Sequence, residues 1–224
     1  MIEYKLIRSD KRKKTISLII NRKGEIIVRA PIKTSMDEIE DLLKAKKRWI
    51  EKRLSIKQTF TNNKKEFVTG ENFLYLGKEY TLEFVDNHNK KGITLKNGRF
   101  LISKEDKENA KRLFIEWYKK AARELILDRL NFYKRQLGFI PSGMKITGAL
   151  SRYGSCSGKN NLSFSWRLIM APLNIIDYVI IHEICHIKEK NHGPHFWGLV
   201  ESIIPDYKQR RKWLKNHRHT LSLE

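Results

Sequence analysis

The stretch YVIIHEICHIKEKNHGPHFW, residues 178–197, holds four of the seven histidines of the chain. It continues a run, LNIIDYVIIHEICHIKEK, that is apolar nearly all round. Such a segment is typical of a buried helix rather than a surface helix. Histidines and a glutamate inside a buried helix need partners, because an unpaired polar group there costs about 1–3 kcal/mol. A bound metal ion would supply such a partner.

His182 and His186 lie four residues apart, and Glu183 follows the first of them. On a helix this spacing puts both imidazole rings on one face, where their nitrogens can converge on one ion. Glu183 sits beside the rings, which suits a base that takes a proton from an activated water. The HExxH pattern therefore predicts a zinc site, with His182 and His186 as ligands and Glu183 as general base.

A catalytic zinc site uses three protein ligands and keeps one position open. After Lys190 the chain turns through the sequence NHGP, which is rich in turn-forming residues. This turn brings His192 or His195 back towards the helix. We expect His192 to be the third ligand, and we keep His195 and a downstream carboxylate such as Glu201 as alternatives.

The cysteine content argues against a disulfide-stabilised secreted domain. The chain has two cysteines, Cys156 and Cys185, and we interpret both as reduced thiols with a structural role in a cytoplasmic protein. No apolar run approaches the roughly 20 residues that cross a bilayer, and the first ten residues lack the apolar core of a secretory signal. The sequence predicts a soluble chain without a membrane partner.

The first third of the chain indicates a small β unit followed by a helix. Apolar residues flank the loop in TISLIINRKGEIIVRAP, residues 15–31, which predicts a hairpin whose Gly24 takes a positive φ. Ser35 and Glu38 form a capping-box pattern before apolar residues at helical spacing. The other face of this helix is basic and carries Lys44, Lys46, Lys47, Arg48, Lys52 and Arg53.

The remaining segments predict further strands and one long helix. Residues 73–103 indicate a second β unit with a turn at Asn97-Gly98, and residues 105–137 indicate a helix that Gly138 ends. Alternating apolar residues over 162–170 then predict a half-buried strand. We predict an N-terminal β-rich region with one basic helix over residues 1–103, and a second domain over residues 104–224.

Lys and Arg outnumber Asp and Glu by 46 to 25, which gives a formal net charge of +21. The excess is greatest in the first third, and such an imbalance favours a polyanionic partner such as nucleic acid. The basic helix face, with Lys11 to Lys14 before it, is the candidate contact, and a solvated helix face is the other interpretation. A nucleic-acid-binding module with a structural zinc would also explain the charge, but such a site needs no base like Glu183.

Two C-terminal blocks resemble the YgjP-like metallopeptidase family, a group of zinc hydrolases related to SprT-like proteases. These blocks are RYGSCSGKNNLSFSWRLIMAP and HEICHIKEKNHGPHFWGLVESIIPDYKQRRKWL. The upstream segments RKKTISLIINRKGEIIVRAP and YLGKEYTL are also similar to the family pattern. The resemblance implies an α+β fold with a zincin-like metallopeptidase domain, in which the HExxH helix is buried beside a small sheet. By position it places the metal ligands at His182, His186 and His192 and the base at Glu183.

The resemblance implies a function and leaves some residues open. It implies zinc-dependent hydrolysis of a peptide or protein substrate, which would add as a strand to the sheet edge near residues 151–170. Because the family is related to SprT-like proteases, the resemblance also implies an alternative function, that of a protease recruited to DNA or RNA. Tyr153 departs from the family, which usually has tryptophan there, and this affects local packing or a substrate contact. The donor that stabilises the oxyanion is expected among Arg152, Tyr153, Tyr178 and His195.

Overall fold

The computed structural model describes residues 2–21, 24–51, 54, 65–86 and 92–223. The chain divides into two compact units, Met1–Lys64 and Lys65–Leu223. Each unit has a hydrophobic core of its own. The two units are therefore described separately.

Three strands form the sheet of the first unit, in the order β1-β3-β2. β2 (Ser17–Ile20) and β3 (Ile26–Pro31) pair antiparallel, and Gly24 between them has a φ of 84°, so the predicted hairpin is confirmed. β1 (Lys5–Ser9) adds to the other side of β3 in parallel. The sequence pattern did not indicate this third strand, because a parallel pairing joins segments without a local turn.

Helix α1 (Met36–Ala45) begins with the predicted capping box. The Ser35 hydroxyl accepts a hydrogen bond from the Glu38 backbone N–H at 3.2 Å, and the Glu38 carboxylate accepts one from the Ser35 N–H at 2.8 Å. Ile39 and Leu43 are buried against the strands. The basic residues Lys44, Lys46, Lys47 and Arg48 are exposed, whereas Lys52 and Arg53 lie outside the described residues.

The second unit begins with a four-stranded sheet in the order β4-β5-β7-β6. β4 (Asn72–Tyr75) and β5 (Lys78–Val85) pair antiparallel, as do β6 (Thr94–Lys96) and β7 (Arg99–Ser103). β5 and β7 run parallel in the middle. The Asn97-Gly98 turn has φ values of 50° and 76°, which confirms the predicted two-residue turn.

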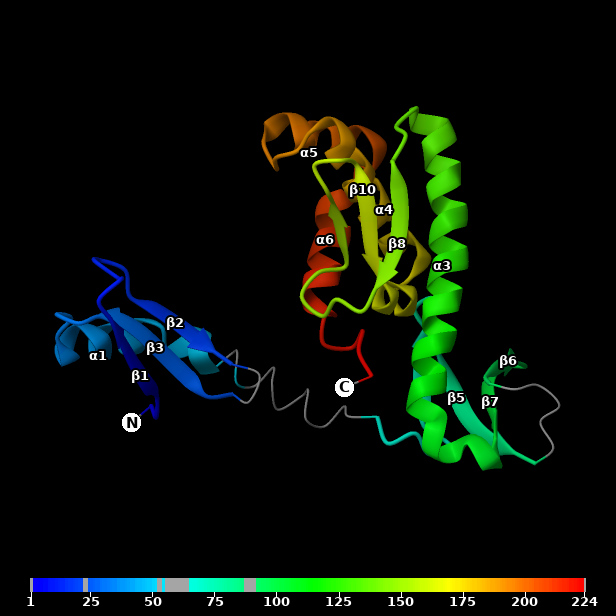
Figure 1. Ribbon diagram of the computed structural model, residues 1–224, viewed down its shortest axis with the longest axis horizontal. Coiled ribbons are helices and arrows are strands. Elements are labelled where there is room, and N and C mark those ends of the chain that lie inside the picture. The colour runs from blue at the N-terminus through cyan, green and yellow to red at the C-terminus, as the bar shows by residue number, and fades with distance from the viewer. Residues whose placement is uncertain (1, 22–23, 52–53, 55–64, 87–91, 224) are drawn as a thin grey trace. The chain divides into compact units, whose positions relative to one another are not determined.

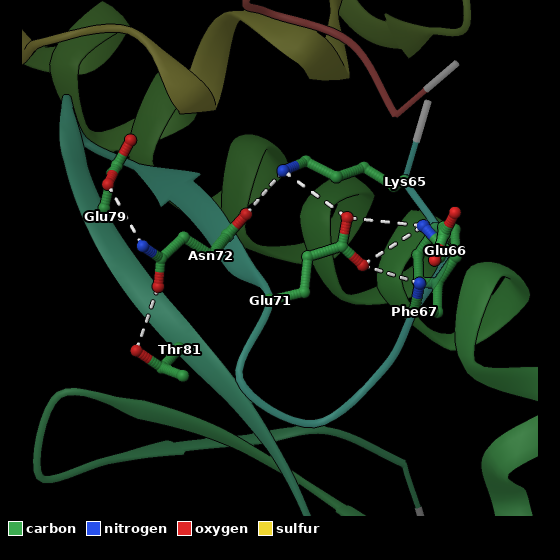
Figure 2. A network of polar contacts seen from close by, with 7 residues as sticks. All are labelled: Lys65, Glu66, Phe67, Glu71, Asn72, Glu79 and Thr81. Atoms are coloured by element: carbon green, nitrogen blue, oxygen red, sulfur yellow. Dashed lines mark hydrogen bonds and ion pairs between the residues drawn. The ribbon is translucent and has the colours of Figure 1, made fainter. Parts of the chain in front are cut away.

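A polar network holds the start of this sheet in place (Figure 2). The Glu71 carboxylate accepts hydrogen bonds from the backbone N–H groups of Glu66 and Phe67, at 3.1 and 2.6 Å. Lys65 pairs with the same carboxylate at 3.7 Å and donates to the Asn72 carbonyl at 2.7 Å. Phe67 has a left-handed φ of 58°, so these bonds hold an unfavourable backbone conformation that places its ring in the core.

Helix α3 (Ala110–Leu137) connects the two sheets of the second unit. A 3-10 turn, Lys104–Asn109, leads into the helix, and Gly138 ends it with a φ of 71°, as predicted. In Figure 1 the helix runs from the four-stranded sheet to β8. Its Phe114 ring stacks on Phe73 of the first of these sheets at 4.0 Å between centroids.

The division between the units differs from the predicted boundary after residue 103. Residues 65–103 share one continuous core with the C-terminal part of the chain, because α3 packs on both sheets. The compact units therefore separate between Lys64 and Lys65. The β-rich composition of residues 73–103 suggested that they belong with the first hairpin. Their packing on α3 instead places them in the second unit.

The second sheet has the order β8-β10-β9. β8 (Gly143–Thr147) runs parallel to β10 (Asn161–Ser165), and β9 (Gly154–Cys156) lies antiparallel to β10 at the edge. The predicted strand over residues 162–170 was too long. It ends at Ser165, whose hydroxyl accepts a hydrogen bond from the Arg167 N–H at 3.4 Å and starts a buried 3-10 turn.

Three helices complete the second unit. α4 (Leu173–Lys188) is the predicted buried helix, and α5 (Pro194–Ile203) and α6 (Tyr207–Asn216) pack against it. The sequence analysis did not identify α6 as a separate helix. None of the helices in the described part of the chain combines the length and the apolar character needed to cross a membrane. The fold is α+β, with the HExxH helix buried beside a small sheet, as predicted.

Candidate metal centre

Three histidine side chains converge at the C-terminal end of α4. His182 and His186 lie one turn apart on the helix, and His192 lies in the turn that follows it. The Nε2 atom of His192 is 3.0 Å from Nε2 of His182 and 3.0 Å from Nε2 of His186. The candidate ligand atoms of the three residues lie within 4.8 Å of one another. Nitrogen atoms this close can bind a single ion.

The hydrogen bonds of these rings fit a metal ion. His186 Nδ1 lies 2.9 Å from the Glu189 carbonyl oxygen, which can only accept, so Nδ1 carries the proton and Nε2 keeps a free lone pair. His192 Nε2 has at most one proton when the ring is neutral, and two nitrogens lie beside it. Without an ion, one of these contacts lacks a good hydrogen bond. The three nitrogens are close enough together to bind one ion between them.

The surroundings of His182 and His192 favour the neutral form of these two rings. Burial, followed by the proximity of His186 and His192, lowers the pKa of His182 to about 3. Burial also lowers the pKa of His192, with His186 and Arg211 adding to the effect. Neutral imidazole is the form that binds a metal. The lowered pKa values of His182 and His192 therefore favour the ligating form of these two rings.

Aromatic residues of α5 support the three rings. Phe196 is fully buried, and its ring stacks on His186 at 4.3 Å between centroids and meets His182 and His192 edge-on at 4.9 and 4.8 Å. Trp197 stacks on His192 at 5.6 Å. His182 Nδ1 is buried and has no hydrogen-bond partner among the described residues. The His182 ring is therefore oriented by packing and by the contact of its Nε2 with His192, and not by a hydrogen bond at Nδ1.

Glu183 is buried beside the histidines and faces the edge strand β9. Burial raises its pKa to about 8, and the positive charge of Arg152 opposes this rise. Gly154 of β9 lies directly against the carboxylate: a Cβ atom there would lie 2.6 Å from Cγ of Glu183, closer than real side chains approach. The sequence analysis did not single out Gly154, although it belongs to the RYGSCSG block. The absence of a side chain at this position makes room for Glu183.

Comparison with known proteins identifies the family. A family model described as YgjP-like, metallopeptidase domain matches residues 14–217. The chain belongs to the YgjP-like metallopeptidase family. This membership agrees with the predicted zincin-like α+β fold and makes the protein a metallopeptidase, a class that uses a metal ion.

No curated protein matches the chain. A solved structure, the crystal structure of the metallopeptidase zymogen of Pyrococcus abyssi abylysin, is 21% identical with a TM-score of 0.37. The match covers 41% of this chain and 93% of that chain.

The other predicted candidates lie apart from the histidine group of this YgjP-like chain. His195 is exposed in the first turn of α5. Glu201 is exposed and pairs with Lys208 at 3.2 Å. Neither belongs to the three-residue group that could hold a metal. Cys156 is half-buried in β9, Cys185 is buried in α4, and both are free thiols.

The four candidate oxyanion donors of the YgjP-like site have different surroundings. Tyr153 donates a hydrogen bond to the Arg218 carbonyl at 3.4 Å. Tyr178 is buried, its ring lies 5.9 Å from that of His182, and burial raises its pKa to about 12. Arg152 is exposed and acts electrostatically on Glu183. Of these candidates, Tyr178 and Arg152 carry groups that interact with Glu183.

One residue near the site, Arg211 of α6, was missed by the sequence analysis. Its guanidinium carbon lies 4.8 Å from the centre of the Trp197 ring. Its charge contributes to the lowered pKa of both His182 and His192. The segment YKQRRKWL carries a helical pattern, but nothing local in it shows which arginine faces the histidines.

Proposed function

We propose that the chain is a zinc-dependent peptidase in which His182, His186 and His192 hold the metal and Glu183 is the general base. The convergence of three imidazole nitrogens beside a buried carboxylate carries this proposal. Three imidazole ligands with one open position are a set that zinc favours in hydrolases. Bound there, zinc would polarise the scissile carbonyl and lower the pKa of the attacking water.

Glu183 performs the proton transfers. Its raised pKa, about 8, makes it a stronger base than an ordinary carboxylate, while the charge of Arg152 favours the ionised form that must accept the proton. The carboxylate removes a proton from the attacking water and then delivers it to the leaving amine nitrogen. Gly154 leaves the space that this carboxylate occupies.

The peptide substrate is expected to bind along β9. This strand is last in the order β8-β10-β9, so one side of its backbone is available for an extended chain. Gly154 of β9 also touches Glu183, so a peptide added there passes beside the base. We assign the oxyanion donor to Tyr178 or Arg152.

The first test compares the wild type with Glu183→Gln, by native mass spectrometry for zinc and by cleavage of fluorogenic peptides. The amide keeps the shape of the side chain but is not a base. We expect one zinc per chain in both proteins and a loss of hydrolysis of about a hundredfold or more in the variant. Loss of zinc from the variant would make Glu183 a ligand, and unchanged hydrolysis would exclude its role as base.

Nucleic-acid binding is the second candidate, and the exposed basic residues of the first unit favour it. Lys44, Lys46, Lys47 and Arg48 are all exposed. Such a face could recruit the peptidase to DNA or RNA. A nucleic-acid-binding module with a structural zinc makes the opposite prediction for the Glu183 test, because hydrolysis would be absent from the wild type as well.

A further inference from the structure

Two neighbouring arginines of α6 have different surroundings. The guanidinium of Arg210 already has partners within the protein. It pairs with Asp206 at 2.9 Å and donates a hydrogen bond to the Asn174 carbonyl at 3.0 Å. Arg211 is exposed and, among the residues that the structure describes, has no hydrogen-bond or ion-pair partner. The hydrogen-bond donors of its guanidinium are therefore available to a ligand.

Trp197 fixes the position of Arg211 relative to the histidines. The guanidinium lies over the indole at 4.8 Å, and the same indole stacks on His192 at 5.6 Å and lies 5.7 Å from the His182 ring. On α6, Tyr207 stacks on the indole at 5.2 Å and is itself buried. A guanidinium that rests on an aromatic face keeps its in-plane N–H groups free. Arg211 is thus held beside the histidine group with its donors exposed.

Within the described residues, Arg211 forms no ion pair with a carboxylate. The Trp197 ring under its guanidinium also lies against the rings of His192 and His182. The nearby carboxylate, Glu183, is buried and interacts with Arg152. A metal cation held by the histidines would add further positive charge on this side. An anionic group in the ligand would relieve this repulsion.

We propose that Arg211 is a specificity residue that binds a carboxylate of the peptide substrate beside the scissile bond. The inference rests on the peptidase function proposed above and names its substrate class. The planar guanidinium matches a carboxylate with two parallel hydrogen bonds, and this geometry distinguishes Arg from a point charge such as Lys. The carboxylate is either an acidic side chain or the C-terminus of the peptide, because the two present the same group.

The test measures binding rather than cleavage. Zinc-loaded Glu183→Gln protein is titrated against fluorescein-labelled heptapeptides of alanine and glycine, with fluorescence anisotropy as the signal. In one series a single glutamate moves through an amidated peptide, and each member has a glutamine counterpart. In a second series the neutral peptide has a free or an amidated C-terminus. The two series separate the two sources of the carboxylate.

We expect at least one carboxylate probe to bind about three- to tenfold more tightly than its neutral counterpart. Arg211→Gln in the same background should bring this ratio close to one while zinc content stays at one per chain. Lys212→Gln removes the same charge from the neighbouring exposed position and should leave the ratio unchanged.

Equal binding of every matched pair would overturn the inference, and so would an equal loss of preference in the Lys212 and Arg211 variants, which would reflect net charge alone. The outcome is separable from that of the proposed function. A carboxylate preference in a protein whose wild type cleaves nothing would refute the peptidase and leave the binding residue. Cleavage by the wild type without any carboxylate preference would support the peptidase and refute the role of Arg211.

Discussion

At the scale of single residues, Gly154 and Glu183 are packed closely against each other. Each belongs to a different element, β9 and α4, and the carboxylate occupies the space that a side chain at position 154 would fill. The contact also removes Glu183 from water, which is the main cause of its raised pKa. A glycine at position 154 thus contributes to the burial of a carboxylate 29 residues away in the sequence.

Gly154→Ala should reduce peptide hydrolysis about tenfold or more while zinc stays bound, because the new methyl group displaces the base but not the ligands. Gly158→Ala is the matched control, since a Cβ at Gly158 would meet nothing within 4 Å. Steady-state kinetics and zinc analysis of both variants check this. Full activity in the Gly154 variant would show that the carboxylate has another position available.

At the scale of elements, an ion pair holds α4 against α3. Arg129 of α3 donates two hydrogen bonds to the Asp177 carboxylate of α4, at 2.7 and 2.8 Å, and one to the Tyr133 hydroxyl at 3.0 Å. Both charged side chains are largely buried, with 24% and 11% exposure. Because α4 carries His182 and His186, this pair also helps to position these two histidines.

Asp177→Asn should lower the free energy of unfolding by about 2–3 kcal/mol, because it leaves Arg129 partly buried beside a neutral amide. Glu201→Gln breaks an exposed pair with Lys208 and should leave the free energy of unfolding almost unchanged, because water screens the two charges. Urea unfolding followed by circular dichroism compares the two variants. Equal changes in the free energy of unfolding would mean that the buried Arg129–Asp177 pair stabilises the fold no more than the exposed pair does.

At the scale of the whole molecule, pH and salt act on the two units through different groups. Burial raises the pKa of Tyr153 to about 12, from an ordinary value of 10.0, and it also raises that of the deeply buried Tyr118. The neutral phenol is therefore favoured by the fold. Its contribution to stability is complete below pH 10 and is lost as the pH rises towards 12.

Tyr153→Phe should flatten the alkaline loss of stability. Between pH 10 and pH 12 the wild type should lose about 2 kcal/mol more than the variant, because phenylalanine has no proton to release in the unfolded state. Urea unfolding at several pH values across this window measures the difference. Parallel curves for the two proteins would mean that Tyr153 ionises in the folded state as readily as in the unfolded state.

The basic face of the first unit should bind nucleic acid through phosphates and without sequence preference. Affinity for duplex DNA should then fall with salt, with a log–log slope of about 0.9 per phosphate contact. Changing Lys44, Lys47 and Arg48 to Glu should flatten the slope by several units and leave zinc content unchanged. Gel shifts at two salt concentrations measure this. Tight binding with an affinity independent of salt, or no binding at low salt, would exclude binding through phosphate contacts.

Local patterns in the sequence were enough to predict several parts of the structure. The spacing of His182 and His186, the capping box at Ser35 and the Asn97-Gly98 turn each depend on residues within one or two turns of chain. Their geometry follows from backbone periodicity and from hydrogen bonds between close neighbours. The family resemblance extended this to the zincin-like class of fold.

Only the tertiary structure decided which distant residues meet. Nothing local separates His192 from His195, and the close approach of the His192 nitrogen depends on how α5 packs on α4. The meeting of Gly154 with Glu183 and the placement of Arg211 over Trp197 likewise join separate elements. The packing of α3 on both sheets also joins separate elements. Because of it the compact units divide after Lys64, and not after residue 103 as predicted. Such contacts depend on the burial and the shape of side chains from different elements. The hydrophobic pattern of the sequence predicts which residues are buried, but it does not predict which residues they contact.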